Sequence, residues 1–185
     1  MAEYRPDSGW MWTYTGRKYW PADPRVEDIH IGDIAHGLAM LCRYTGHTAY
    51  FYSVAEHSVL VSLMVPPELA LEALLHDASE AYLGDIGRPL KHFLLDYQEI
   101  EKRNDRVIRE RFLLPPTEHR LVKAADSDIL HTEMRALCKL LPPGTAIPGE
   151  FRPGTQIFCW PWQAAEIAFL NRYQALLRAD GARYS

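Results

Sequence analysis

Apolar residues in this chain recur at three- and four-residue spacing over most of its length, the pattern of amphipathic helices. The strict alternation of apolar and polar residues that marks strands is nearly absent, apart from short stretches near 12–19 and 156–159. We therefore expect an all-α fold, a helical bundle. The spacing predicts helices over 31–46, 53–64, 67–84, 96–112, 117–141 and 161–178.

Two of these helices carry recognisable end signals. Ser53-Val54-Ala55-Glu56 has the form of a capping box, in which the serine and glutamate side chains each satisfy a free backbone amide. Pro67 suits the first position of the next helix, and Gly84 suits its C-terminal cap. We expect His76, Asp77 and Glu80 to lie inside that helix.

The chain has 185 residues with no internal repeat, which predicts one domain over 1–185. Its expected parts are an aromatic, extended N-terminal segment over 1–30, a helical core over 31–141, and a loop with a final helix over 142–185. A net charge of −4 argues against binding to a nucleic acid polymer, although a small anionic substrate needs only a few local cations.

The sequence also bears on the cellular compartment. No apolar run is long enough to span a bilayer, and the N-terminus lacks the basic-then-apolar order of a secretory signal. Cys42, Cys138 and Cys159 are odd in number and show no C-x-x-C spacing, so we expect reduced cysteines. These features predict a cytoplasmic protein that does not bind a membrane.

Four side chains with metal-binding chemistry fall on three different predicted helices: His57, the pair His76-Asp77, and Asp126. Imidazole and carboxylate together suit a divalent transition metal, and such groups are costly to bury without partners. Taken singly, each has a simpler explanation. A His-Asp pair is more often found at a surface or helix end, a lone histidine is more often packed, and Asp126 could pair with Lys123.

The ordered set resembles a known family. The stretches SVAEHSVLVS (53–62), LLHDASEAYLGDIGRPLK (74–91) and LVKAADSDILHTEMRAL (121–137) are similar to those of HD-domain phosphohydrolases. The resemblance covers roughly 31–137 and is greatest to small bacterial and phage enzymes that act on 5′-deoxynucleotides. It implies a homo-oligomer with an HD-domain helical bundle.

The resemblance also implies roles for particular residues. One divalent metal (Co, Mn, Zn, Ni or Fe) would be held by His57, His76, Asp77 and Asp126. Acidic residues beside the metal would position water and handle protons, and basic and aromatic residues would contact the phosphate and the sugar or base. The acidic pair is Glu80 and Asp85, and the substrate contacts are Arg43, Tyr44 and Lys91.

The spacing of these residues agrees with such chemistry. On a helix, His76, Asp77 and Glu80 would face one side. A metal would neutralise a phosphate oxygen and acidify a water molecule, and Glu80 could orient that water or move its proton. The guanidinium of Arg43 would donate two hydrogen bonds to the phosphate in a bidentate arrangement.

Several functions remain open from the sequence. We expect hydrolysis of nucleoside 5′-monophosphates first, and a dNTP triphosphohydrolase second, because Arg88 and Lys91 could bind extra phosphates. A di-iron oxygenase needs more ligands than the set supplies, and a non-catalytic nucleotide-binding protein would normally have lost a ligand or the acid. Trp10, Trp12 and Trp20 could stack on a base, or form an N-terminal lid or subunit contact.

Overall fold

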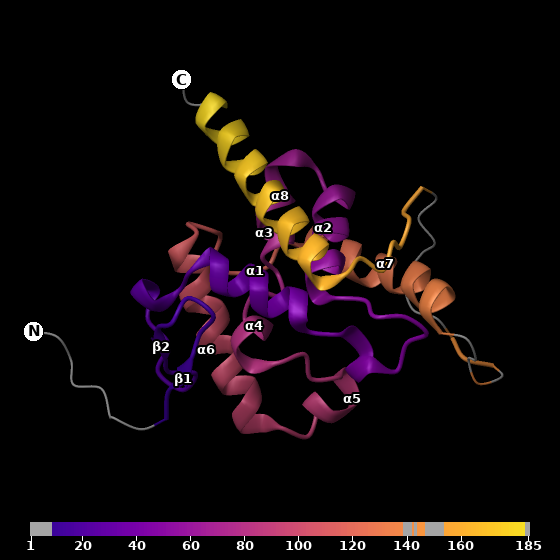
Figure 1. The fold of residues 1–185 in the computed structure, drawn as a ribbon, viewed down its shortest axis with the longest axis horizontal. Helices are drawn as coiled ribbons and strands as arrows, with labels where there is room; N and C mark the ends of the chain where they lie inside the picture. The colour runs from indigo at the N-terminus through magenta and orange to yellow at the C-terminus, as the bar shows by residue number, and fades with distance from the viewer. Residues whose placement is uncertain (1–8, 139–141, 143, 147–153, 184–185) are drawn as a thin grey trace, which may run out of the picture.

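The computed structural model describes residues 9–138, 142, 144–146 and 154–183, and this part of the chain is mostly helical (Figure 1). The all-α prediction is therefore confirmed at the level of fold class. No helix in the described part is both long and apolar enough to cross a membrane. The helices are α1 (Ile31–Met40), α2 (Val54–Met64), α3 (Ala70–Leu74), α4 (Glu80–Leu83), α5 (Arg88–Lys91), α6 (Leu95–Arg111), α7 (Arg120–Leu137) and α8 (Trp162–Arg183). The remaining elements are short. They are the 3-10 helices η1 (Val26–Asp28), η2 (Arg43–Gly46) and η3 (Pro67–Leu69) and the strands β1 (Met11–Trp12) and β2 (Lys18–Tyr19).

Helix α2 lies at the centre of the bundle. Its first nine residues, Val54 to Ser62, are all buried, and it packs against α1, α3, α7 and α8. Figure 1 shows α8 running across α1 and α2. The polar side chains of α2, among them Glu56 and His57, are buried with most of the helix and therefore need partners inside the protein.

The predicted capping box at the start of α2 is half right. The Ser53 hydroxyl accepts a hydrogen bond from the Glu56 backbone N–H at 3.1 Å, as an N-cap should. The Glu56 carboxylate instead accepts from the backbone N–H groups of Phe158, Cys159 and Trp160, at 2.7, 3.0 and 2.7 Å. Glu56 therefore anchors the segment that leads into α8, and 156–159 forms no strand there.

The first predicted helix, over 31–46, ends earlier than its spacing suggests. Helix α1 stops at Met40, and the backbone of Leu41 and Cys42 is extended. It is held by antiparallel hydrogen bonds to 52–54, among them Arg43 N–H to Tyr52 O at 2.9 Å. Arg43 is therefore part of this paired segment and not of the predicted helix.

The predicted helix over 67–84 is broken where the chemistry lies. Helix α3 ends at Leu74, residues 75–79 form turns with hydrogen bonds to the third residue back, and α4 begins at Glu80. The His76 side chain bonds the Ala73 carbonyl at 2.8 Å, the acceptor that a regular helix would offer to Asp77. Gly84 ends α4 with φ +84°, as its predicted cap position requires.

The N-terminal aromatic segment forms a small antiparallel hairpin of β1 and β2. Its turn is tied to α1, because Asp33 accepts hydrogen bonds from the Thr15 backbone N–H at 2.7 Å and hydroxyl at 3.0 Å. Tyr19 is buried, stacks on Tyr82 and hydrogen-bonds Asn104. The predicted 117–141 helix is too long: α7 begins at Arg120 and ends at Leu137, where the backbone of Cys138 is extended. Residues 139–141 and most of the 142–154 loop lie outside the described residues, and α8 starts at Trp162, close to its predicted start.

Gly37 marks the close approach of α1 to α4. A methyl group there would lie 2.9 Å from both the Cβ and the carbonyl oxygen of Ala81. In an open helix Gly→Ala raises stability by roughly 0.5–1 kcal/mol. Here we expect Gly37→Ala to lower the free energy of unfolding by about 1–3 kcal/mol, because the two backbones must move apart. Urea denaturation measures this change.

Gly32 in the same helix is the matched control. A methyl group there would meet only the Thr15 side chain, at an ordinary 3.7 Å. Gly32→Ala should leave the denaturation midpoint unchanged or raise it. Equal behaviour of the two variants would contradict the tight contact between α1 and α4.

Candidate active site

The structure brings together all four residues that the sequence singled out as metal ligands. His57 comes from α2, Asp126 from α7, and His76 and Asp77 from the turn between α3 and α4. The two histidine Nε2 atoms are 3.3 Å apart. Asp77 Oδ2 lies 3.5 Å from the Nε2 of His57 and 3.1 Å from that of His76. Asp126 Oδ1 lies 3.3 and 4.0 Å from the same two nitrogens.

Hydrogen bonds on the far side of each imidazole determine its orientation. His76 Nδ1 is 2.8 Å from the Ala73 carbonyl oxygen, which can only accept, so Nδ1 carries the proton. His57 Nδ1 is 2.6 Å from Glu133 Oε1, a carboxylate oxygen that also accepts. In the neutral form, both histidines therefore direct an Nε2 lone pair into the cluster. Two such lone pairs at 3.3 Å repel each other unless a cation or a proton lies between them.

The residues present fit a divalent cation. Nitrogen and oxygen ligands lie about 2.0–2.2 Å from such an ion, so neighbouring ligand atoms are separated by about 3.0–3.5 Å. The distances between the Nε2 atoms and the carboxylate oxygens, 3.1 to 4.0 Å, are close to this range. The ligand atoms of His57, His76 and Asp126 all lie within 4.8 Å of one another, and Asp77 lies beside both imidazoles. Imidazoles and carboxylates together suit Mn, Fe, Co, Ni or Zn.

The charges in the cluster reinforce one another. Burial opposes a charge on Asp77, but His76, His57 and Arg43 hold the pKa of its carboxyl far below the usual range. Burial likewise opposes a charge on His76, yet Asp77 and Asp126 raise its pKa to about 9. The negative surroundings that favour a proton on His76 also favour a metal ion, which would replace that proton.

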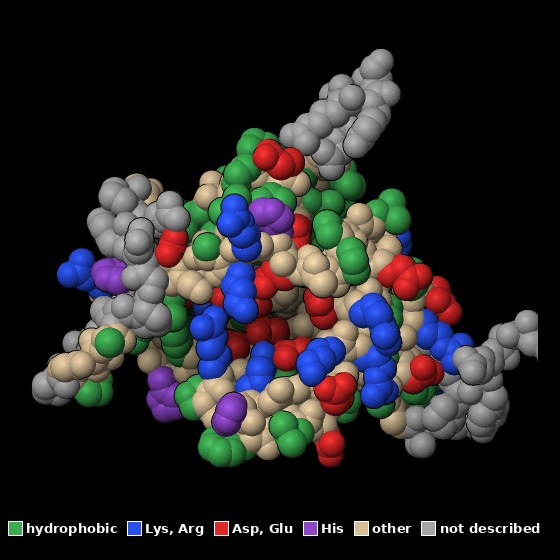
Figure 2. All heavy atoms as spheres, turned by 180° about the vertical axis from the view of Figure 1, so that it is seen from behind, with side chains coloured by type: hydrophobic (Ala, Val, Ile, Leu, Met, Phe, Trp, Pro, Cys, Tyr) green, Lys and Arg blue, Asp and Glu red, His purple; other side chains and the backbone are tan. Residues whose placement is uncertain are grey.

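The cluster borders a pocket of about 500 Å³. Figure 2 shows a hollow on this face of the molecule, with acidic side chains inside it and Lys and Arg side chains around it. None of the described residues of the N-terminal hairpin lines the pocket, and Trp10 and Trp12 pack edge-to-face on each other instead. The lining residues are Arg43, Tyr44, Thr45, Asp77, Glu80, Asp85, Ile86, Gly87, Arg88, Pro89, Lys91, Asp126, Leu130 and Met134.

Glu80 and Asp85, the proposed acid–base residues, both line this pocket. Glu80 starts α4 and is buried, with one carboxylate oxygen that has no hydrogen-bond partner. Burial raises the pKa of Glu80 well above its usual value, and the charges of Asp77 and Asp85 raise it further. Burial also raises the pKa of Asp85. A carboxyl that is easily protonated beside a metal site is suited to proton transfer.

Arg43 and Tyr44 form the wall opposite these acids. Arg43 Nη1 lies 3.6 Å from Asp77 Oδ2, and its Nη2 lies 3.3 Å from Glu133 Oε2. The next two residues, Tyr44 and Thr45, have left-handed backbones with φ +57° and +54°. For side chains larger than glycine this conformation is unfavourable, so tertiary contacts have to hold the segment in place.

Lys91 and Arg88 approach the pocket from α5. Lys91 Nζ lies 2.6 Å from Glu101 Oε1 on α6, so this proposed phosphate contact is ion-paired. Arg88 is largely exposed, yet its Nη2 donates to Asp126 Oδ2 at 2.9 Å. The ion pair that the structure gives Asp126 is therefore with Arg88, not with Lys123.

The sequence analysis missed Glu133. This α7 residue is fully buried and contacts Arg43, Tyr44, Tyr52 and His57. One feature of the sequence could have indicated Glu133: it follows Asp126 by seven residues, which puts it on the same helix face two turns further along. A carboxylate on an otherwise apolar, core-facing stretch indicates a buried partner.

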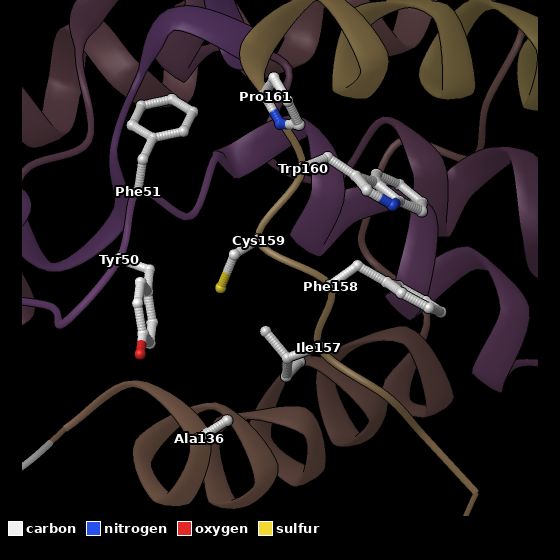
Figure 3. Close-up of a pocket in the computed structure, with 8 residues that line it drawn as sticks. All are labelled: Tyr50, Phe51, Ala136, Ile157, Phe158, Cys159, Trp160 and Pro161. Carbon is white, nitrogen blue, oxygen red and sulfur yellow. The ribbon is translucent and has the colours of Figure 1, made fainter.

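A second cavity, of about 570 Å³, lies between Tyr50 and Phe51 on one side and 157–161 on the other (Figure 3). Figure 3 shows the Cys159 sulfur directed into the space above Ala136. Its lining is mostly apolar and contains no carboxylate or imidazole, so it lacks the groups that hydrolytic chemistry needs. Carboxylates line the 500 Å³ pocket, and His76 lines a neighbouring cavity of about 260 Å³ together with Asp77 and Glu80.

Comparison with known proteins finds relatives of this chain. No model of a known protein family matches it. The chain is 49% identical to the uncharacterized protein YfdR of Escherichia coli strain K12 over 125 residues, which is 68% of this chain and 70% of YfdR. It is 40% identical to the uncharacterized protein RCAP_rcc00048 of Rhodobacter capsulatus over 189 aligned residues, covering 92% of this chain and 96% of that protein. The chain therefore belongs to the protein family that includes YfdR and RCAP_rcc00048.

Proposed function

We propose that this protein is a metal-dependent phosphohydrolase of the HD-domain type that acts on 5′-(deoxy)nucleotides, and on nucleoside 5′-monophosphates in particular. The observation that supports this most is the arrangement of His57 and His76. Each Nδ1 is engaged outside the cluster, and both Nε2 atoms face Asp77 and Asp126. The order of these residues along the chain is the order that the HD-domain resemblance implies.

The side chains around the cluster have matching roles. A divalent cation held by the four residues would supply positive charge to a phosphate oxygen and make a water molecule more acidic. Arg43 would bind the phosphate through its guanidinium, which already faces a carboxylate oxygen of Asp77. The unpartnered carboxylate oxygen of Glu80 would accept a hydrogen bond from the attacking water and take up its proton.

The remaining pocket walls suit a sugar and a base. Asp126, Leu130 and Met134 are four residues apart on α7, so one face of this helix supplies both the metal site and an apolar wall. Tyr44 lines the same pocket from η2. A volume of about 500 Å³ lies in the range of small-molecule sites.

The three cations of the pocket bear on the choice between monophosphates and triphosphates. Arg43, Arg88 and Lys91 each face a carboxylate already, from Asp77, Asp126 and Glu101 respectively. Their charge is therefore partly compensated, which favours a substrate with one phosphate. The second candidate, a dNTP triphosphohydrolase, is supported by the presence of Arg88 and Lys91 in the pocket lining.

The other hypotheses keep a lower rank. Among the described residues, one group of His, Asp, Glu or Cys has the spacing of a metal site, so a second iron lacks ligands there. A purely nucleotide-binding role would not explain why the buried carboxyl of Glu80 lines the pocket. Assembly as a homo-oligomer and a cytoplasmic location stay predictions from the sequence.

The direct test of the proposed function is product analysis. Purified protein with Mn²⁺ or Co²⁺ should release orthophosphate from deoxynucleoside monophosphates and leave triphosphates intact. Release of inorganic triphosphate from a dNTP, with monophosphates untouched, would support the second candidate instead. No product across the whole panel, with metal shown to be bound, would contradict both.

Metal removal should lower stability in a way that depends on His76. At a free Co²⁺ or Mn²⁺ concentration of about 100 Kd, binding raises the free energy of unfolding by about 2.7 kcal/mol. For a domain of this size this corresponds to about 5–10 °C in Tm, a shift that a chelator should reverse. His76→Ala should abolish the shift. His36→Gln should retain it, because the partner of His36 is Glu166, outside the pocket.

Glu80→Gln should separate catalysis from metal binding. Loss of the acid–base group should lower kcat by about 10²–10⁴-fold, while bound metal stays near one per chain. Glu166→Gln is the matched control, because this glutamate lies on α8 outside the pocket. Unchanged kcat in Glu80→Gln would show that Glu80 does not transfer the proton.

A further inference from the structure

We propose that Glu133 is a positioning residue that couples the metal site to the phosphate-binding arginine, through one carboxylate oxygen on each side. This inference rests on the proposed function. It adds a residue that lines neither the pocket nor the ligand cluster, and that acts only through His57 and Arg43. It also accounts for two tyrosines, Tyr44 and Tyr52, whose hydroxyl groups point at the same carboxylate.

The two oxygens of Glu133 serve different neighbours. Oε1 accepts hydrogen bonds from His57 Nδ1 at 2.6 Å and from the Tyr52 hydroxyl at 2.8 Å. Oε2 accepts from the Tyr44 hydroxyl at 2.6 Å and lies 3.3 Å from Arg43 Nη2. The first oxygen thus contacts a metal ligand, and the second contacts the segment that carries the phosphate-binding side chain.

Four donors explain why a carboxylate can be buried here. Glu133 has no exposed surface, and a buried charge without partners is strongly disfavoured. Two tyrosine hydroxyl groups, the His57 ring and the Arg43 guanidinium surround the carboxylate, so both of its oxygens act as acceptors.

An acceptor in this position determines which nitrogen of His57 binds metal. Because Oε1 takes the Nδ1 proton, the neutral ring keeps a lone pair on Nε2, which faces Asp77 and Asp126. Carboxylates that hydrogen-bond the outer nitrogen of a histidine ligand fix its tautomer and make it a stronger ligand. A neutral amide at 133 could donate to Nδ1 and so favour the wrong tautomer.

The same carboxylate holds the phosphate side in place. Tyr44 and Thr45 are two successive non-glycine residues with positive φ, a conformation that needs support from outside the segment. The hydrogen bond from Tyr44 to Oε2 supplies it, and the Arg43 guanidinium is aligned beside it. Loss of this oxygen would let η2 relax and would shift Arg43 from the pocket wall.

The test is Glu133→Gln, which keeps the size of the side chain but replaces one acceptor oxygen by a donor. Co²⁺ titration, followed by the visible absorption of the bound ion, measures metal affinity without any substrate. We expect the Co²⁺ dissociation constant to rise about 10–100-fold. At saturating Co²⁺, the KM for the best monophosphate should also rise, because Arg43 is no longer aligned.

Two further variants help to separate a positioning role of Glu133 from a general loss of stability. Tyr52→Phe removes one donor from Oε1 but keeps the charge, so it should weaken Co²⁺ binding less than Glu133→Gln while leaving KM unchanged. Asp33→Asn is the control for loss of a buried carboxylate, since Asp33 is 4% exposed and holds the N-terminal hairpin. It should lower Tm without changing the Co²⁺ dissociation constant.

The results distinguish this inference from the proposed function. Wild-type affinity for Co²⁺ in folded Glu133→Gln would overturn the positioning role, whatever the enzyme hydrolyses. If Glu133→Gln does not fold, wild-type Co²⁺ affinity in Tyr52→Phe would overturn it instead. If the wild-type protein binds Co²⁺ but hydrolyses no nucleotide, the proposed function fails, and the Co²⁺ titrations still decide the role of Glu133.

Discussion

The structure depends on two adjacent ionisable side chains, Glu56 and His57, in the first turn of its central, buried helix α2. Both are completely buried, so each must find polar partners inside the protein or lose the free energy of its hydration. Glu56 obtains three backbone N–H groups from 158–160, about a hundred residues away in the sequence. His57 obtains Glu133 on one side and the metal-ligand cluster on the other. Through Glu56, helix α2 thus holds the segment that leads into α8, and through His57 it contributes to the candidate site.

Departures from regular structure are concentrated around the same site. The helix that would carry His76 and Asp77 opens into turns, Tyr44 and Thr45 adopt left-handed backbones, and one oxygen of Glu80 has no partner. Away from the site, the buried carboxylate of Asp33 is satisfied by Thr15, whereas one oxygen of Glu72 and the hydroxyl of Ser58 have no partner among the described residues. Strain and unsatisfied polar atoms persist at a functional site when the surrounding structure holds them in place, as Glu133 does for η2.

Local signals in the sequence predicted much of the helical architecture, including the Ser53 cap and Gly84 with its positive φ. The resemblance to HD-domain phosphohydrolases, and not local spacing, grouped His57, His76, Asp77 and Asp126 as one set of ligands. The break at 75–79 was missed because a side chain, His76, competes with the backbone for an acceptor. The hydrogen-bond partners of Glu56 and Glu133 were missed because they lie on distant segments of the chain. The spacing of apolar residues predicts which side chains are buried, but not which residues they contact. Lys91 was predicted at the pocket, and its ion pair with Glu101 could not be read from either helix alone.

The charge balance of the pocket bears on how a phosphate could enter it. Four carboxylates line the pocket (Asp77, Glu80, Asp85 and Asp126) against three cations (Arg43, Arg88 and Lys91). Burial raises the pKa of Glu80 and of Asp85, whereas the pKa values of Asp77 and Asp126 are lowered by their neighbours, so the last two hold their charge most firmly. A divalent cation held by Asp77 and Asp126 would neutralise these two carboxylates and make the field in the pocket more favourable to an anion. Under the proposed function, metal binding would therefore favour the entry of a phosphate. Glu133 would keep Arg43 aligned whether or not the ion is bound, since its contact with the guanidinium does not involve the oxygens of Asp77 or Asp126.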